Sequence, residues 1–120
     1  MLEATPKAPA RARELVRSLP AEETTRRKVE LIVSELVTNS VVHTGVGARD
    51  MVRLRLRCEQ SGVSGEVCDP GTGFSWTGEE PDLSEPGGLG LMVVDQLAKE
   101  WGVRHNGETC VWFACVDSES

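Results

Sequence analysis

Three polar residues, Glu35, Asn39 and His43, lie at helical spacing in a part of the sequence rich in valine. Side chains four residues apart lie above one another on a helix, so these three form one stripe, and the neighbouring valines and leucine face away from it. A carboxamide oxygen is a hard ligand that suits Mg²⁺ beside substrate phosphates. A carboxylate one turn away can take a proton from a hydroxyl group or a water molecule. The stripe therefore predicts polar chemistry on one face of a helix.

Two glycine-rich stretches follow this stripe along the chain. "DPGTGF" (69–74) begins where a strand is expected to end, and "GGLGL" (87–91) begins a helix. The carboxylate of Asp69 can accept a hydrogen bond from an exocyclic amine such as that of adenine, and glycine amides at a helix N-terminus can hold a phosphate. Neither stretch is a Walker A loop, and neither has the context of a dinucleotide fingerprint. Each stretch alone is weak evidence for a nucleotide site. The stronger evidence is the order of the three features along the chain: a polar stripe on a helix, an aspartate at a strand end, and glycines at a helix start.

The elements that must position these residues follow from the hydrophobic periodicity. Together they predict an α+β fold, a two-layer α/β sandwich with helices on one face of a mostly antiparallel sheet. The long Gly-, Pro- and acid-rich segment from Pro70 to Gly88 is typical of a lid. The expected helices cover 8–19, Pro20 to about Thr44, and 89–100, and the expected strands cover 51–58, 63–69, 101–106 and 109–116.

Length and charge limit the possible functions. A chain of 120 residues is expected to form one domain. Its net charge of −6 argues against a nucleic-acid or anionic-membrane surface. The acidity lies in residues 58–120, with 2 Lys and Arg against 12 Asp and Glu. No secretion signal or apolar run of membrane length is found, so the expectation is a soluble, cytoplasmic protein.

The four cysteines form no Cys-x-x-Cys pair, which gives a zinc or thioredoxin-like site little support. Each falls in an apolar, strand-like run. They are therefore expected to be small buried hydrophobic residues in a reducing compartment. The four are Cys58, Cys68, Cys110 and Cys115.

One expected strand has an arginine at every second position, and this group has two interpretations. The favoured one is a solvated sheet face, and the other is a surface for an acidic partner. The arginines are Arg53, Arg55 and Arg57. Trp101 and Trp112 lie in strand-like runs and are expected in the core.

Taken in order, the motifs resemble the N, G1 and G2 boxes of the GHKL ATPases, the superfamily of DNA gyrase and the histidine kinases. The resemblance covers roughly residues 8–116 and implies the Bergerat, or histidine-kinase-like, fold, with one ATP-binding domain over 1–120 and a lid at about 74–87. The small size, the lack of a phosphoacceptor helix and the ending "GETCVWF" are most similar to the bacterial anti-sigma-factor serine/threonine kinases. The matching motifs are Glu35-x-x-x-Asn39-x-x-x-His43, Asp69-x-Gly71-x-Gly73 and Gly88-x-Gly90.

The resemblance also implies residue roles and partners. Asn39 would hold Mg²⁺, Glu35 would be the catalytic general base, and Asp69 would bind the adenine amine of ATP. His43 would either contact the nucleotide or cap the helix end. The expected partners are a sigma factor and an anti-anti-sigma protein of the STAS type, with a homodimer as the assembly. The other nucleotide-binding candidates are Gly71, Gly73, Gly88, Leu89, Gly90, Leu91 and Thr109.

The sequence departs from this family pattern in two places. "MLEATPK" is poor strand material, so the strand that usually precedes the first helix is expected to be absent or degenerate. The expected lid has four acidic residues and no Lys or Arg, although phosphoryl transfer needs cations to offset phosphate charge. A non-catalytic ATP-binding module is therefore an alternative to the kinase. A detached histidine-kinase catalytic domain ranks last, because the longer lid with further glycine boxes is missing.

Overall fold

The computed structural model describes residues 2–3, 7–43, 51–69, 88–105 and 108–117. Its elements follow the predicted order of two helices, two strands, a helix and two strands, preceded by one very short strand. None of the helices in these ranges combines the length and the apolarity needed to cross a membrane. The helices are α1 (Ala8–Arg17), α2 (Glu23–His43) and α3 (Gly88–Leu97), and the strands are β1 (Leu2–Glu3), β2 (Met51–Glu59), β3 (Gly62–Asp69), β4 (Glu100–His105) and β5 (Thr109–Val116).

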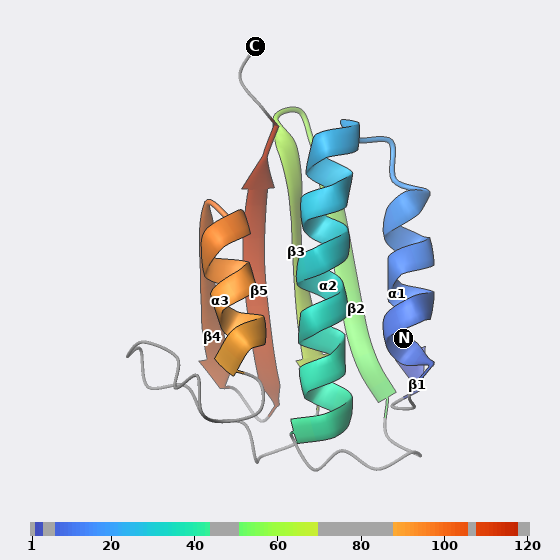
Figure 1. The fold of residues 1–120 in the computed structure, drawn as a ribbon, viewed down its shortest axis with the longest axis vertical. Coiled ribbons are helices and arrows are strands. Elements are labelled where there is room, and N and C mark those ends of the chain that lie inside the picture. Colours follow the sequence, from blue (N-terminus) through green and yellow to red (C-terminus); the bar gives the residue numbers. More distant parts are fainter. Residues whose placement is uncertain (1, 4–6, 44–50, 70–87, 106–107, 118–120) are drawn as a thin grey trace.

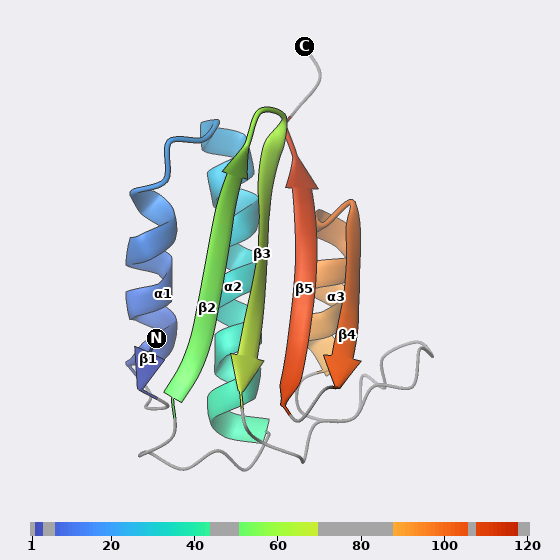
Figure 2. The ribbon, with the colours of Figure 1, turned by 180° about the vertical axis from the view of Figure 1, so that it is seen from behind.

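The strands form one sheet in the order β1-β2-β3-β5-β4, in which every neighbouring pair is antiparallel. All three helices lie against the same face of this sheet (Figure 1), and the opposite face is left uncovered (Figure 2). This arrangement is the two-layer α+β sandwich that the sequence predicts. The expected degenerate first strand is β1, which pairs with β2 through two residues.

The core lies between the helices and the sheet. On α2 the buried apolar residues recur three and four positions apart, which is the helical repeat of one face. Phe113 of β5 is the largest fully buried side chain in the described part of the chain. The apolar residues of α2 that are buried in this core are Val29, Ile32, Val33, Leu36 and Val37.

The short helix α1 packs on α2 through a stripe of small residues. Ala8, Ala12 and Val16 are buried at a spacing of four residues. At the end of α1, Arg17 forms an ion pair with Glu30 of α2, with Nη2 2.7 Å from Oε1. Through this buried stripe and the ion pair, α1 and α2 lie side by side on the sheet.

Two details differ from the sequence prediction. The third helix was predicted to reach Glu100, but it ends at Leu97 and Glu100 already belongs to β4. The reason is that the Lys99 amide donates to the Ala114 carbonyl at 2.8 Å, so pairing with β5 begins there. Trp112 was predicted in the core, but its indole packs over Gly102 on the uncovered face.

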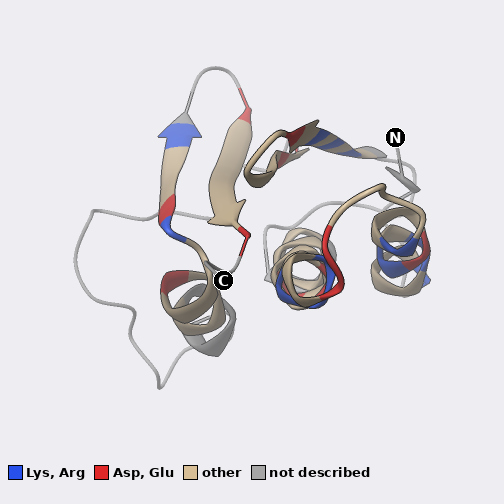
Figure 3. Cartoon of the chain, turned by 90° about the horizontal axis from the view of Figure 1, so that it is seen from above, with Lys and Arg blue, Asp and Glu red and all other residues tan. Residues whose placement is uncertain are grey.

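Charge is distributed unevenly over the elements. Seen from above, Lys and Arg lie on α1, on α2, on β2 and at the two ends of β4, whereas α3 has no basic residue in its last turn (Figure 3). This matches the basic first half and acidic second half of the sequence.

Candidate functional site

The elements that contain the three motifs converge at one end of the molecule. The C-terminal end of α2, the end of β3 and the starts of β5 and α3 all lie there (Figure 1). Antiparallel pairing explains part of this arrangement, because the last residue of β3, Asp69, is opposite the first residue of β5, Thr109. Residues far apart in the sequence are therefore brought to one edge of the sandwich.

A small cavity of about 10 Å³ lies between α2 and the strands β3 and β5. This space is enough for about one water molecule. Three of the sequence-predicted residues, Asn39, Asp69 and Thr109, line it together. Its complete lining is Leu36, Asn39, Ser40, Val67, Asp69, Thr109 and Val111.

The carboxylate of Asp69 is held in place by a residue that the sequence analysis missed. Asp69 is 3% exposed, and its Oδ2 accepts a hydrogen bond from the Ser40 hydroxyl at 2.8 Å. A serine within a helix gives little signal from the sequence, because its hydroxyl commonly bonds back to the helix itself. The hydroxyl of Thr38 on the same helix bonds back in this way, since its Oγ1 donates to the Ser34 carbonyl at 2.7 Å. Ser40 instead fixes the orientation of the buried carboxylate.

Asn39 is buried beside Ser40, and its Nδ2 atom has no hydrogen-bond partner among the described residues. An unsatisfied buried amide costs free energy, so such a group is expected to have a ligand. Because the two ends of a carboxamide are assigned from their hydrogen bonds, the same position can present the oxygen to a cation. Asn39 therefore fits either a phosphate oxygen or Mg²⁺.

The remaining predicted residues are placed as follows. Glu35 is half-buried on α2 one turn before Asn39, but it is not among the residues that line the cavity. His43 is the last residue of α2, and its side chain lies outside the description. The glycine-rich stretch 88–91 forms the first turn of α3, as predicted, with side chains outside the description. Gly71, Gly73 and the lid at 74–87 fall in residues that are not described.

The prediction that all four cysteines are small buried hydrophobic residues is wrong. Cys68 and Cys110 form a disulfide, and Cys58 is exposed. The bond joins directly opposed residues of β3 and β5, whose Cα atoms are 4.0 Å apart. Cys115 alone fits the prediction, since it is buried as a free thiol and burial raises its pKa to about 11.

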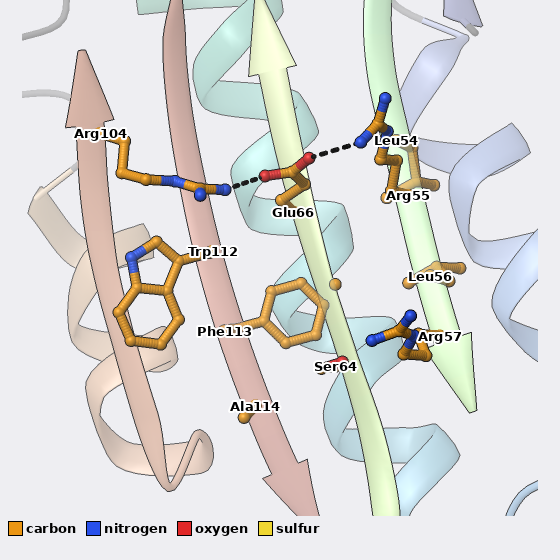
Figure 4. Close-up of a pocket in the computed structure, with 11 residues that line it drawn as sticks. Leu54, Arg55, Leu56, Arg57, Ser64, Glu66, Arg104, Trp112, Phe113 and Ala114 are labelled. Carbon is orange, nitrogen blue, oxygen red and sulfur yellow. Dashed lines mark hydrogen bonds and ion pairs between the residues drawn. The ribbon is translucent and has the colours of Figure 1, made fainter. Parts of the chain in front are cut away.

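A second, larger hollow of about 900 Å³ lies on the uncovered face of the sheet (Figure 4). At its centre the carboxylate of Glu66 pairs with Arg104 and with Arg55, whose Nη1 is 3.6 Å from Oε1. Arg53 pairs with Glu108 in the same way. Two arginines of β2 therefore pair with acidic residues of the same chain, Arg53 with Glu108 and Arg55 with Glu66. The hollow is separated from the Asn39 cavity by the sheet.

The sequence of residues 2–115 matches the histidine kinase-like ATPase domain family. This chain belongs to that family. Membership in this family of ATPase domains implies nucleotide binding.

Two solved structures share the fold. One, of the RsbU and RsbW domains of Rv1364c from Mycobacterium tuberculosis, has a TM-score of 0.71 and 20% identity, covering 96% of this chain and 30% of that one. The other, the blue-light activated histidine kinase EL346 of Erythrobacter litoralis, has a TM-score of 0.57 and 24% identity, covering 77% and 32%. The ATPase domain thus spans about a third of each of these chains. No curated protein matches the sequence.

Proposed function

We propose that this ATPase domain is an ATP- and Mg²⁺-binding regulator of the anti-sigma-factor kinase type. It would act as a single domain over residues 1–120 with a lid at about 74–87, and transfer phosphate from ATP to a serine of an anti-anti-sigma protein. The observation that supports nucleotide binding best is that Asn39, Asp69 and Thr109, from three different elements, line one cavity. The fold likeness to the structure that contains an RsbW domain supports the regulatory class.

Each residue of the site has a chemical role in this proposal. Asp69, oriented by Ser40, accepts a hydrogen bond from the exocyclic amine of adenine, and Thr109 lies opposite it in the strand pair. The amides at the start of α3 face the phosphates, because a helix N-terminus favours anions. Asn39 holds Mg²⁺, which when bound offsets the charge of the phosphates. Glu35 takes the proton of the serine hydroxyl.

The partners follow from the class of regulator. We propose that the domain binds a sigma factor and an anti-anti-sigma protein of the STAS type, and that it forms a homodimer. We place it in the cytoplasm, where such partners and ATP are found. The intramolecular ion pairs of Arg53 and Arg55 do not favour the use of that sheet face for nucleic acid.

A specific observation favours a second candidate, a module that binds ATP and partners without phosphoryl transfer. Glu35, the proposed general base, does not line the Asn39 cavity in the described part of the chain. The expected lid is acidic and has no Lys or Arg, whereas phosphoryl transfer needs cations near the phosphates, so the lid also favours the module. In this version the nucleotide only changes the affinity for a partner.

One experiment separates the two candidates. The protein is incubated with ³²P-labelled ATP, Mg²⁺ and a STAS-type protein encoded near its gene, in parallel with Glu35→Ala. Glu14→Ala is the matched control, because Glu14 is an exposed glutamate on α1, away from the cavity. Label transfer that is lost only in Glu35→Ala supports the kinase. ATP binding with no transfer from any of the three proteins supports the module.

A second measurement tests the site itself. Asp69→Asn replaces one acceptor oxygen of the adenine contact with a donor, so ATP binding measured by calorimetry should be lost. Asp95→Asn is the control, because Asp95 is exposed on α3. Full-strength binding by Asp69→Asn would show that adenine binds elsewhere, and no binding by the wild-type protein would overturn the proposal as a whole.

A further inference from the structure

The disulfide lies directly beneath the candidate nucleotide site. Cys68 precedes Asp69 in β3 and Cys110 follows Thr109 in β5, so two successive residue pairs join the ends of these strands. Side chains alternate between the faces of a sheet. The Asp69 and Thr109 side chains therefore face the helices and the cavity, while the disulfide crosses the same strand pair on the uncovered face.

Arginines flank this bond on both sides. The register places Arg53 of β2 opposite Cys68 and Arg104 of β4 opposite Cys110, so the four residues form one row across the sheet. The Nε atom of Arg53 is buried and has no hydrogen-bond partner among the described residues. Guanidinium groups beside a cysteine favour the thiolate, the form that takes part in thiol–disulfide exchange. Both guanidinium groups are ion-paired, Arg53 with Glu108 and Arg104 with Glu66, and the Glu66 carboxylate lies within 4.8 Å of both sulfur atoms, so charges of both signs surround the pair.

The bond also holds the two strands close together at the cavity. The Cα atoms of Cys68 and Cys110 are 4.0 Å apart, compared with about 4.5 Å for an ordinary close pair in an antiparallel sheet. In this state the cavity is about 10 Å³, whereas ligand pockets are typically hundreds of Å³. The described cavity is too small for a purine, so nucleotide binding at Asp69 requires α2 and the ends of β3 and β5 to move relative to one another. The disulfide adds a covalent tie to the pairing between these strand ends and so limits how far they can adjust.

We propose that the Cys68–Cys110 disulfide is a redox switch that lowers nucleotide affinity when formed and raises it when reduced. The inference rests on the proposed nucleotide site. Disulfides in reducing compartments are usually transient or redox-sensing, which agrees with a switch in a cytoplasmic regulator. Because a ligand favours the state that it binds better, bound nucleotide in turn favours the reduced pair by the same factor.

The chemistry is a two-electron exchange with a dithiol reductant of the thioredoxin class. Its first thiolate attacks the sulfur of Cys110, the more exposed of the pair at 8% against 0% for Cys68. The protein S–S bond breaks, a mixed disulfide forms, and the released Cys68 thiolate takes up a proton. The second thiolate of the reductant then attacks the mixed disulfide and releases Cys110, which is also protonated, while the reductant becomes a disulfide. Oxidised glutathione reverses the reaction.

Metal binding is the competing use of the same residues. The ligand atoms of Glu66, Cys68 and Cys110 lie within 4.8 Å of one another. However, one carboxylate oxygen of Glu66 pairs with Arg55 and the other with Arg104, so both are already engaged by cations. The carboxylate is thus a poor third ligand, and we favour the redox switch.

The test compares the two redox states of the full chain. A fluorescent ATP analogue is titrated with Mg²⁺ into protein oxidised with glutathione disulfide and into protein reduced with a dithiol, after mass spectrometry has confirmed each state. We expect the reduced protein to bind at least about fivefold more tightly. The double variant Cys68→Ala/Cys110→Ala should bind like the reduced protein under both conditions. Cys58→Ser, which changes the exposed free cysteine, should retain the wild-type response.

Each outcome has a definite meaning. Equal affinity in the two states, or tighter binding by the oxidised protein, overturns the switch and leaves the proposed nucleotide site intact. Absence of binding in both states and in the double variant overturns the nucleotide site and the switch together. The test is also repeated with a zinc chelator. If the chelator abolishes the tighter binding by the reduced protein, the two cysteines form a metal site and the switch is wrong. If the double variant fails to fold, the wild-type comparison decides alone.

Discussion

Replacing Ser40 by alanine tests whether the buried carboxylate of Asp69 depends on its helix partner. The hydroxyl donates to Asp69 Oδ2 at 2.8 Å, and the two residues are 4% and 3% exposed. Ser40→Ala removes this donor without adding bulk. Because water has little access to the carboxylate, the lost hydrogen bond is replaced poorly, and the folded state should be destabilised.

The expected loss is about 1.5–3 kcal/mol in the free energy of unfolding, the range for a hydrogen bond to a charged group. For a domain of this size that corresponds to a fall of about 5–15 °C in Tm. Urea denaturation followed by circular dichroism at pH 7 measures the loss directly. In an Asp69→Asn background the same change should cost only about 0.5–1.5 kcal/mol, because the acceptor is then neutral.

Thr38→Val is the matched control on the same helix. It removes a hydroxyl whose hydrogen bond runs back to the Ser34 carbonyl of the same helix, and it keeps the shape of the side chain. Its expected cost is below that of Ser40→Ala. The reasoning is refuted if Ser40→Ala costs no more than Thr38→Val, or if its cost is the same whether residue 69 is aspartate or asparagine.

Two further predictions concern stability. Burial raises the pKa of the Cys115 thiol from 9.0 to about 11. The unfolded chain therefore loses this proton first, and the free energy of unfolding should fall by up to about 2 kcal/mol between pH 9 and 11. Cys115→Ala should remove this part of the pH dependence, and parallel profiles of the two proteins would contradict the assignment. Gly65→Ala should lower the urea midpoint by an amount equivalent to about 1–3 kcal/mol, because its Cβ would lie 2.8 Å from Phe113 Cζ and 2.7 Å from the Arg55 carbonyl oxygen. Adding Phe113→Leu should restore part of the loss, and an unchanged midpoint in Gly65→Ala would show that the strands move apart freely.

The features that could be predicted are those encoded in short stretches of sequence. Helix α2 was predicted within a few residues, because its apolar repeat is long and glycines follow it. Asn39 and Asp69 could be selected as candidates because their residue types, in the order of the three motifs, fit one ligand chemistry. They line one cavity together with Thr109, and their binding roles stay predictions.

The features that could not be predicted depend on contacts between distant residues. Cys68 and Cys110 are separated by 42 positions, and only the register of β3 with β5 shows that they are opposed. The hydrogen bond from Ser40 to Asp69 spans 29 positions, from a helix to a strand. The early end of α3 has the same origin, since pairing of Lys99 with Ala114 stops the helix. Local periodicity contains no information about such pairings.

The short strand β1 has a consequence for how copies of this protein meet. It pairs with β2 only at Met51 and Val52, so within the described residues the outer edge of β2 from Arg53 to Glu59 has no strand beside it. An open edge of this length could join the sheet of another copy and start aggregation. Arg53, Arg55 and Arg57 place a positive charge at every second residue of that edge. Arginines along an edge strand disfavour its pairing with the same edge of a second copy, so we do not expect two copies to associate through β2.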